Sequence, residues 1–179
     1  MTGIFAAATF WPFISPALIH GMGSSLGLYF QKFEFNASIF YIVRAIGFWV
    51  KGWDIIQVAS FWMALCSALM IVALSMLANV RKQNLPGIFL WPFFIYFAFA
   101  SIIHPWYAVP LVAFSIFSRY RFPLIWSFTI FLSYIGYSGT GFQEHFWVLL
   151  LEYVPVYAIM GYELWKHRDL MKLSLVPTE

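Results

Sequence analysis

Long apolar stretches separated by short polar ones dominate the chain. The clearest runs from Ile55 to Ala78, and at about 1.5 Å per helical residue it would span roughly 36 Å, enough to cross a hydrocarbon core of about 30 Å. A chain that crosses lipid must satisfy its backbone N–H and C=O groups internally, and barrel strands would alternate apolar and polar residues. The unbroken runs therefore predict helices. We expect six spans: Ile4–Ile19, Ile55–Ala78, Ile88–Ile103, Tyr107–Phe117, Pro123–Tyr137 and Phe146–Leu164.

The composition strengthens this prediction. Of the 179 residues, 63% are hydrophobic and 9% are charged, against about 45–50% and about 25% in typical soluble proteins. So few charges could not cover a surface that faces water. The fold class that we predict is all-α, a polytopic transmembrane helix bundle, with residues 1–179 forming a single membrane domain.

The distribution of Lys and Arg predicts the orientation in the membrane, because these residues concentrate in cytoplasmic loops. With the N-terminus in the cytoplasm and six alternating spans, seven of the ten basic residues lie inside and three outside. We therefore expect both termini in the cytoplasm, with 1–20 as first span, 21–54 as outer loop, 55–165 as remaining spans and 166–179 as cytoplasmic tail. The inner group is Arg81, Lys82, Arg119, Arg121, Lys166, Arg168 and Lys172, and the outer group is Lys32, Arg44 and Lys51.

A rival arrangement would join Ile88–Phe117 into one long helix. It would place Arg81 and Arg119 on opposite sides of the membrane and would bury Pro105 in the middle of a helix, where a proline costs about 3 kcal/mol. In the first turn of a new helix the same proline is well tolerated. We therefore expect two spans joined by a tight outer turn at His104–Trp106.

The long outer loop contains a segment of its own helical character. Ala37–Val50 is apolar at helical spacing and holds one charge, Arg44, with Lys51 just beyond. This pattern is typical of a helix that lies in the membrane interface.

Polar groups near the membrane are costly and are often functional. Glu34 and Asn36 stand between aromatic residues and could hydrogen-bond hydroxyl groups, but Asn36 or Ser38 could instead cap the helix that follows. Arg44 could grip a phosphate with two hydrogen bonds. From spacing alone, an arginine that extends to lipid headgroups is the better interpretation of Arg44.

Two further clusters lie on the same predicted side. The His104 imidazole could donate to a phosphate or a hydroxyl, while Trp106 and Tyr107 suit either a sugar site or the ordinary aromatic belt of the interface. In the last span, beyond Glu144 and His145, a carboxylate at Glu152 needs a partner. We expect a structural hydrogen bond there, from Arg44, His104 or Tyr134. Tyr153 adjoins it.

Other classes of site are missing from the sequence. It contains no phosphate-cradling glycine loop, no nucleophile elbow, no H-E-x-x-H pattern and no Cys/His cluster with zinc spacing. We therefore expect no resident cofactor and no nucleic-acid partner, and a divalent metal stays open. A small transporter is disfavoured, because scattered Ser and Thr residues do not form a polar path through the bilayer.

Three stretches resemble bacterial membrane glycosyltransferases of the GT-C superfamily, mannosyltransferase-like members especially. Tyr29–Arg44 (YFQKFEFNASIFYIVR) is similar to one of their segments. His104-Pro105-Trp106-Tyr107, with the later basic turn Arg119-Tyr120-Arg121, looks like their late loop. Leu151–Pro155 is similar to their last helix, and order and spacing agree from about residue 20 to residue 168.

The resemblance implies transfer of a sugar, mannose by this likeness, from a polyprenyl-phosphate carrier to an acceptor on the non-cytoplasmic face of the bacterial inner membrane. It implies contact with membrane lipid and with the sugar-bearing carrier. The residues that it would place around the carrier phosphate or sugar are Lys32, Glu34, Asn36, Arg44, His104, Trp106 and Tyr107.

The chain departs from the family in length. Members are more than twice as long, and their catalytic carboxylate lies in an N-terminal half that has no counterpart here. The sequence could therefore be a fragment, a truncated reading frame, or one piece of a split enzyme in which a protein partner supplies that half. Glu34 is the candidate replacement base, on the ground of position alone. The alternative is a non-catalytic membrane subunit or scaffold of a larger complex.

Overall fold

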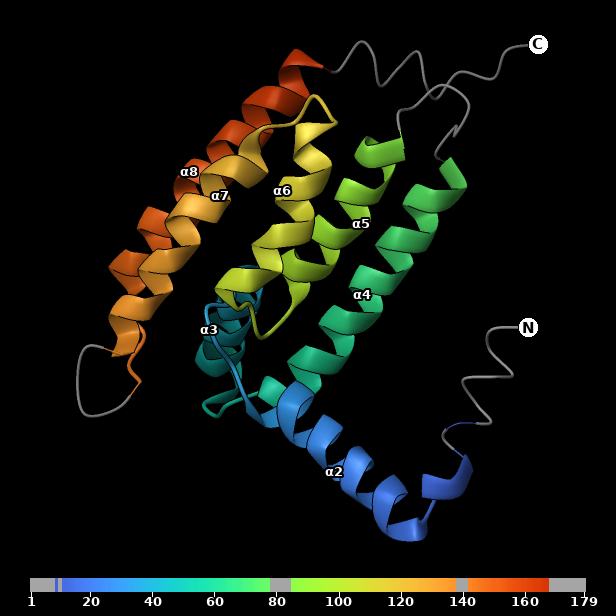
Figure 1. The fold of residues 1–179 in the computed structure, drawn as a ribbon. Helices are drawn as coiled ribbons and strands as arrows, with labels where there is room; N and C mark the ends of the chain where they lie inside the picture. Colours follow the sequence, from blue (N-terminus) through green and yellow to red (C-terminus); the bar gives the residue numbers. More distant parts are fainter. Residues whose placement is uncertain (1–8, 10, 78–84, 138–141, 168–179) are drawn as a thin grey trace.

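The computed structural model describes residues 9, 11–77, 85–137 and 142–167, and for 26–32 it describes the backbone only. Within these residues the chain is helical, with one isolated bridge in place of any sheet. Figure 1 shows the long helices running side by side in alternating directions. They are α4 (Ile56–Leu77), α5 (Leu85–Phe99), α6 (Ala108–Ile116), α7 (Phe122–Thr129), which continues as the 3-10 helix η3 (Ile130–Tyr137), and α8 (Phe146–Lys166).

Two further helices lie at one end of this bundle. α3 (Ile39–Lys51) packs against α4 and α5, and α2 (Pro16–Lys32) extends at an angle from the lower end of α4 in Figure 1. We call this end, where α3 lies, the α3 end. Short 3-10 helices, η1 (Trp11–Phe13) and η2 (Pro105–Tyr107), complete the described elements.

The N-terminal region differs from the predicted first span, Ile4–Ile19. The part of that range that the structure describes contains η1 and then the start of α2, which begins at Pro16 and continues to Lys32, through residues predicted as loop. The reason is local. Pro16 has no N–H to lose in a first turn, and the Ser15 hydroxyl accepts the N–H of Leu18 at 3.1 Å, which is an N-cap.

The predicted break between two helices near His104–Trp106 is present, and so is a helix over most of Ala37–Val50. α5 ends at Phe99, and Pro105 occupies the first position of η2, from which α6 continues. The helix predicted over Ala37–Val50 is α3, which begins at Ile39 and ends at Lys51. Its chain leaves through Gly52, whose φ of 76° lies in the left-handed region that glycine adopts without strain and whose N–H bonds to the carbonyl of Phe48.

A buried carboxylate fixes the opposite end of the bundle. Glu163 of α8 is 7% exposed and accepts the backbone N–H groups of Arg121, at 2.8 Å, and of Phe122, at 3.2 Å. These N–H groups lie at the start of α7, where backbone N–H groups have no hydrogen-bond acceptor within their own helix. The core between α5, α6, α7 and α8 is aromatic, with Phe94 and Phe122 in edge contact at 4.9 Å.

The outer surface of the helices is strongly apolar. Two helices, Ile56–Met76 and Phe146–Lys166, are long and apolar enough to cross a membrane, yet only 17% and 28% of their most apolar windows are buried within the structure. A helix that is apolar on every face needs apolar surroundings, and exposed apolar patches of this extent mark contact with lipid or protein. The other apolar helices of the bundle are shorter, at 10–17 residues.

Candidate functional site at the α3 end

The segment between α2 and α3 is bonded to the loop between α5 and η2. The N–H of Phe35 donates to the carbonyl of Ser101 at 3.0 Å, and the N–H of Ile103 donates to the carbonyl of Phe35 at 2.8 Å. Phe35, Ser101 and Ile103 are all buried. The two predicted clusters, one around Glu34 and Asn36 and one around His104, therefore lie together at the α3 end.

The His104 side chain lies between aromatic rings at this junction. Its ring is stacked on Trp106 with centroids 4.4 Å apart, and its centroid is 5.0 Å from that of Phe35 and 5.5 Å from that of Tyr107. Within the described part of the chain the imidazole nitrogens make no hydrogen bond. Partial burial lowers the pKa of His104 below its ordinary value, so the neutral ring, with one donor and one acceptor nitrogen, is favoured.

Asn36 connects three parts of the chain. Its φ of 49° lies in the left-handed region, which asparagine tolerates better than most residues. Its backbone N–H donates to Glu144 Oε1 at 2.6 Å, its Nδ2 donates to Glu152 Oε1 at 2.9 Å, and its carbonyl accepts the Tyr153 hydroxyl at 2.5 Å. The segment before α3 is thereby fixed to the N-terminal half of α8.

Glu152 has other partners than the predicted ones. It is fully buried, and the Trp126 indole N–H on α7 also donates to its Oε1, at 2.9 Å. The expected partners Arg44, His104 and Tyr134 are wrong, because this face of α8 packs on α7 and on Asn36. The expected structural role of Glu152 agrees with these bonds. Its Oε2 and the Oδ1 of Asn36 have no partner among the described residues.

Arg44 is engaged by two carboxylates. Its guanidinium lies 2.6 Å from Glu34 Oε1, and it donates to Asp54 Oδ2 from Nη2 at 3.1 Å and from Nε at 3.2 Å. Asp54 in turn accepts the N–H of Ile56 at 3.0 Å, at the start of α4. Arg44 therefore links the segment before α3 to the start of α4. Burial raises the pKa of Glu34 above its ordinary value in spite of the favourable charge of Arg44.

The proposed capping of α3 by a side chain is wrong. Ser38 occupies the N-cap position without a capping hydrogen bond. Its hydroxyl instead donates to the carbonyl of Ala98 at 3.0 Å and lies 3.0 Å from the hydroxyl of Tyr157. The Asn36 amide is used by Glu152. The two side chains therefore connect the start of α3 to α5 and α8 and do not cap α3.

The remaining predicted residues lie around this junction. Lys32 is the last residue of α2, and its side chain lies outside the described residues. Trp106 is 58% exposed at the surface of the α3 end. Tyr107 stacks on Phe97 with centroids 5.5 Å apart. The carboxylate of Glu144 is partly buried against Asn36 although the residue as a whole is exposed, and this burial raises its pKa.

Two residues of the site were not predicted. Asp54 stands directly before the longest apolar run, which is the sequence position of an N-cap, so the signal was present. Trp126 gives no local signal, because its bond to Glu152 crosses between two helices. Among the described residues, no group of three or more His, Cys, Asp or Glu side chains is arranged to hold a metal ion.

No protein-family model, curated protein or solved structure matches this chain. We therefore infer the function from the geometry of the α3 end.

Proposed function

We propose that this chain is the membrane-embedded part of a glycosyltransferase of the bacterial inner membrane. It would transfer a sugar, with mannose as the first candidate, from a polyprenyl-phosphate carrier to an acceptor on the non-cytoplasmic face. The observation that carries the proposal is the backbone pairing of Phe35 with Ser101 and Ile103, which holds the Glu34–Asn36 segment beside the His104 turn.

The proposed placement in the membrane is polytopic, with both termini in the cytoplasm. The proposed spans among the described helices are α4, α5, α6, α7 with η3, and α8. The N-terminal crossing stays a prediction from sequence, because α2 extends at an angle from the bundle and is not among its apolar helices. Support comes from the apolar exposed surface of these helices and from the basic residues Arg119, Arg121 and Lys166 at the end away from α3. α3 would lie in the interface, with Ile42, Ile46 and Trp49 exposed toward lipid.

In this proposal His104 is the principal group that contacts the carrier. Its nitrogens make no hydrogen bond among the described residues, so one N–H can donate to a phosphate or sugar oxygen, and fixed donors of this kind stabilise a departing phosphate. Trp106 and Tyr107 offer aromatic faces to the sugar ring. Lys32, whose side chain lies outside the described residues, stays a candidate from the sequence alone.

The general base is assigned to a partner polypeptide. Glu34 lies at the correct end, but its Oε1 is 2.6 Å from the Arg44 guanidinium, and this ion pair engages the carboxylate that would have to accept the proton of an acceptor hydroxyl. Alone, the chain would therefore bind the carrier and turn over slowly.

A transfer assay with radiolabelled polyprenyl phosphomannose tests this proposal. In native membranes, where a partner is present, we expect His104→Ala to reduce transfer about 10-fold to 100-fold, the value of one hydrogen bond to a charged group. The control is His167→Ala, at the opposite end of the bundle, which should leave transfer unchanged. Equal transfer by the two variants would refute the role of His104, and rapid transfer by the purified chain alone would refute the need for a partner.

A second candidate is a non-catalytic membrane subunit or scaffold. It is favoured by one observation, that Glu34, Asn36, Arg44, Glu152 and Tyr153 are all occupied by bonds within the chain. The double substitution of Arg44→Ala with His104→Ala separates the two. Retained assembly with a partner and unchanged carrier binding would support the scaffold and contradict the enzyme.

A further inference from the structure

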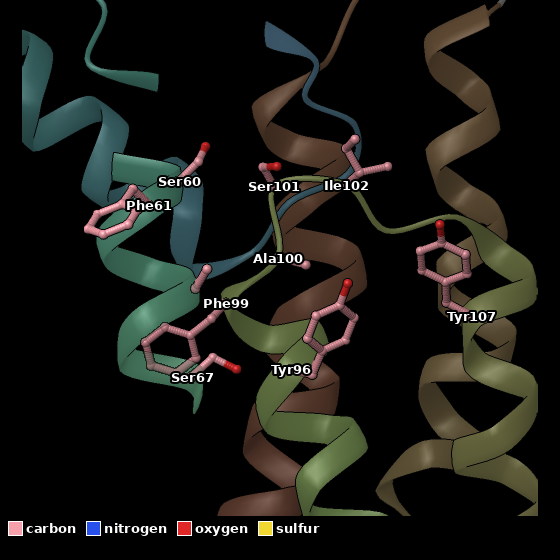
Figure 2. Close-up of a pocket in the computed structure, with 10 residues that line it drawn as sticks. Ser60, Phe61, Ser67, Tyr96, Phe99, Ala100, Ser101, Ile102 and Tyr107 are labelled. Atoms are coloured by element: carbon pink, nitrogen blue, oxygen red, sulfur yellow. The ribbon is translucent and has the colours of Figure 1, made fainter. Parts of the chain in front are cut away.

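A cavity of about 220 Å³ lies between α4 and α5 at the α3 end (Figure 2). Its walls come from α4, from α5, from the loop at 100–102 and from η2. The lining is mostly apolar, with hydroxyl groups among aromatic and small side chains. The residues are Ser60, Phe61, Ala64, Ser67, Tyr96, Phe99, Ala100, Ser101, Ile102 and Tyr107.

The cavity exists because α4 presents small side chains to bulky ones. Ser60, Ala64 and Ser67 are spaced by four and three residues, so they lie on one face of the helix. Tyr96 and Phe99 face them from α5. From Ser60 to Ser67 the wall extends about 10 Å along the helix axis. The part of the wall that α4 contributes therefore follows the direction of the bundle.

One hydroxyl in the wall has no protein partner. Ser60 Oγ is buried and makes no hydrogen bond within the described residues, whereas Ser75 on the same helix donates to the carbonyl of Ile71 at 2.7 Å. Serines in apolar helices commonly form that internal bond. Ser60 lies one turn from the start of α4, so it belongs to the part of the wall nearest the α3 end.

The cavity and the His104 turn share residues. Ser101 and Ile102 line the cavity, and the same loop pairs with the Phe35 backbone. Tyr107 lines the cavity as well, and its ring centroid is 5.5 Å from that of His104. A ligand with an anionic group at His104 can therefore extend an apolar chain into this space.

We propose that this cavity binds the first part of the isoprenoid chain of the carrier, directly after its phosphate. The inference depends on the proposed function, since it places a second portion of the same ligand. At about 220 Å³ the space is smaller than the roughly 300–1,000 Å³ of pockets that enclose a whole small molecule, so it suits one segment of a longer chain. A phospholipid has two chains on one headgroup, and the cavity accommodates part of only one.

The test measures binding of undecaprenyl phosphate and of isopentenyl phosphate, which has a single isoprene unit, to the full chain in nanodiscs. Ala64→Phe fills the cavity from α4. The matched control is Ala73→Phe, because Ala73 is an exposed alanine of the same helix outside the lining. We expect Ala64→Phe to weaken undecaprenyl phosphate binding about tenfold, a loss of about 1.4 kcal/mol in binding free energy. Ala73→Phe should leave the affinity unchanged. The affinity for isopentenyl phosphate should be lower, and it should differ less between the two variants.

The outcomes separate this inference from the proposed function. Equal undecaprenyl phosphate affinity in Ala64→Phe and Ala73→Phe would overturn the cavity assignment and leave carrier binding standing. Absence of binding by the wild type would overturn both. Full competition by dioleoyl phosphatidylglycerol would show an ordinary acyl-chain site and would also overturn the assignment. Ala64→Leu, a smaller change, should give an intermediate loss, and matching unfolding temperatures exclude misfolding as the cause.

Discussion

The Nδ2 of Asn36 donates a 2.9 Å hydrogen bond to the Glu152 carboxylate, 116 positions further along the chain. Both side chains are buried, at 1% and 0% exposure. The same Glu152 oxygen also accepts from Trp126. This one atom of α8 therefore joins α7 to the segment that precedes α3. The position of the whole candidate site depends on this junction.

Substitution of Glu152 tests the junction. Glu152→Leu should lower the free energy of unfolding strongly, because the Asn36 amide and the Trp126 indole N–H lose their acceptor and each unsatisfied donor costs about 1–3 kcal/mol. Glu152→Gln keeps an acceptor oxygen, and its new amide can donate to the unpartnered Oδ1 of Asn36. It should cost about 1 kcal/mol or less. Denaturation in mixed micelles measures both changes, and equal stability of Glu152→Leu and the wild type would show that this junction does not stabilise the fold.

Glu144 predicts a pH dependence. Its pKa in the folded chain is raised above 4.5 by burial, so the folded state holds the proton more tightly than the unfolded state. The corresponding stability is fully present below pH 4.5 and is lost as the pH rises through the folded-state pKa. Glu34 acts in the same direction.

The unfolding temperature of the wild type should therefore fall more steeply above pH 4.5 than that of Glu144→Gln. His104 has a lowered pKa and works in the opposite direction, with stability lost as the pH falls below 6.5, but it is common to both proteins and cancels in the difference. Parallel pH profiles for the two proteins would show that the Glu144 carboxylate is not buried against Asn36.

Two glycines give opposite predictions. A Cβ on Gly47 of α3 would overlap the side chain of Ile55, whereas a Cβ on Gly161 of α8 would meet nothing within 4 Å. Gly47→Ala should lower the free energy of unfolding by about 1–3 kcal/mol through overpacking. Gly161→Ala should raise it by up to about 1 kcal/mol, because alanine favours a helix. The same sign for both substitutions would mean that α3 does not pack closely on the start of α4.

The fold could be predicted from sequence where hydropathy alone decides. The runs behind α4, α5 and α8 are long and apolar, and Pro105 can only begin a helix, so the turn before η2 was predictable. The start of α2 was missed because the average hydropathy of Ile4–Ile19 concealed the Ser15-Pro16 boundary.

The candidate site was predictable as a list of residues and not as a set of bonds. Asn36, Arg44 and Glu152 stand out as polar residues in apolar surroundings. Their partners depend on how helices pack, and no local pattern encodes the bond between Asn36 and Glu152. The hydrogen bonds between Arg44 and Asp54 are intermediate between a local and a long-range contact, because ten positions separate the two residues.

A binding measurement with undecaprenyl phosphate on the full chain in nanodiscs tests directly whether the α3 end binds the carrier phosphate. We expect saturable binding that His104→Ala weakens about 10-fold to 100-fold, the loss of one hydrogen bond to a charged group. His167→Ala, at the other end of the bundle, should bind like the wild type. Equal affinity in all three proteins, or no saturable binding by the wild type, would contradict the assignment of the α3 end as a carrier-phosphate site.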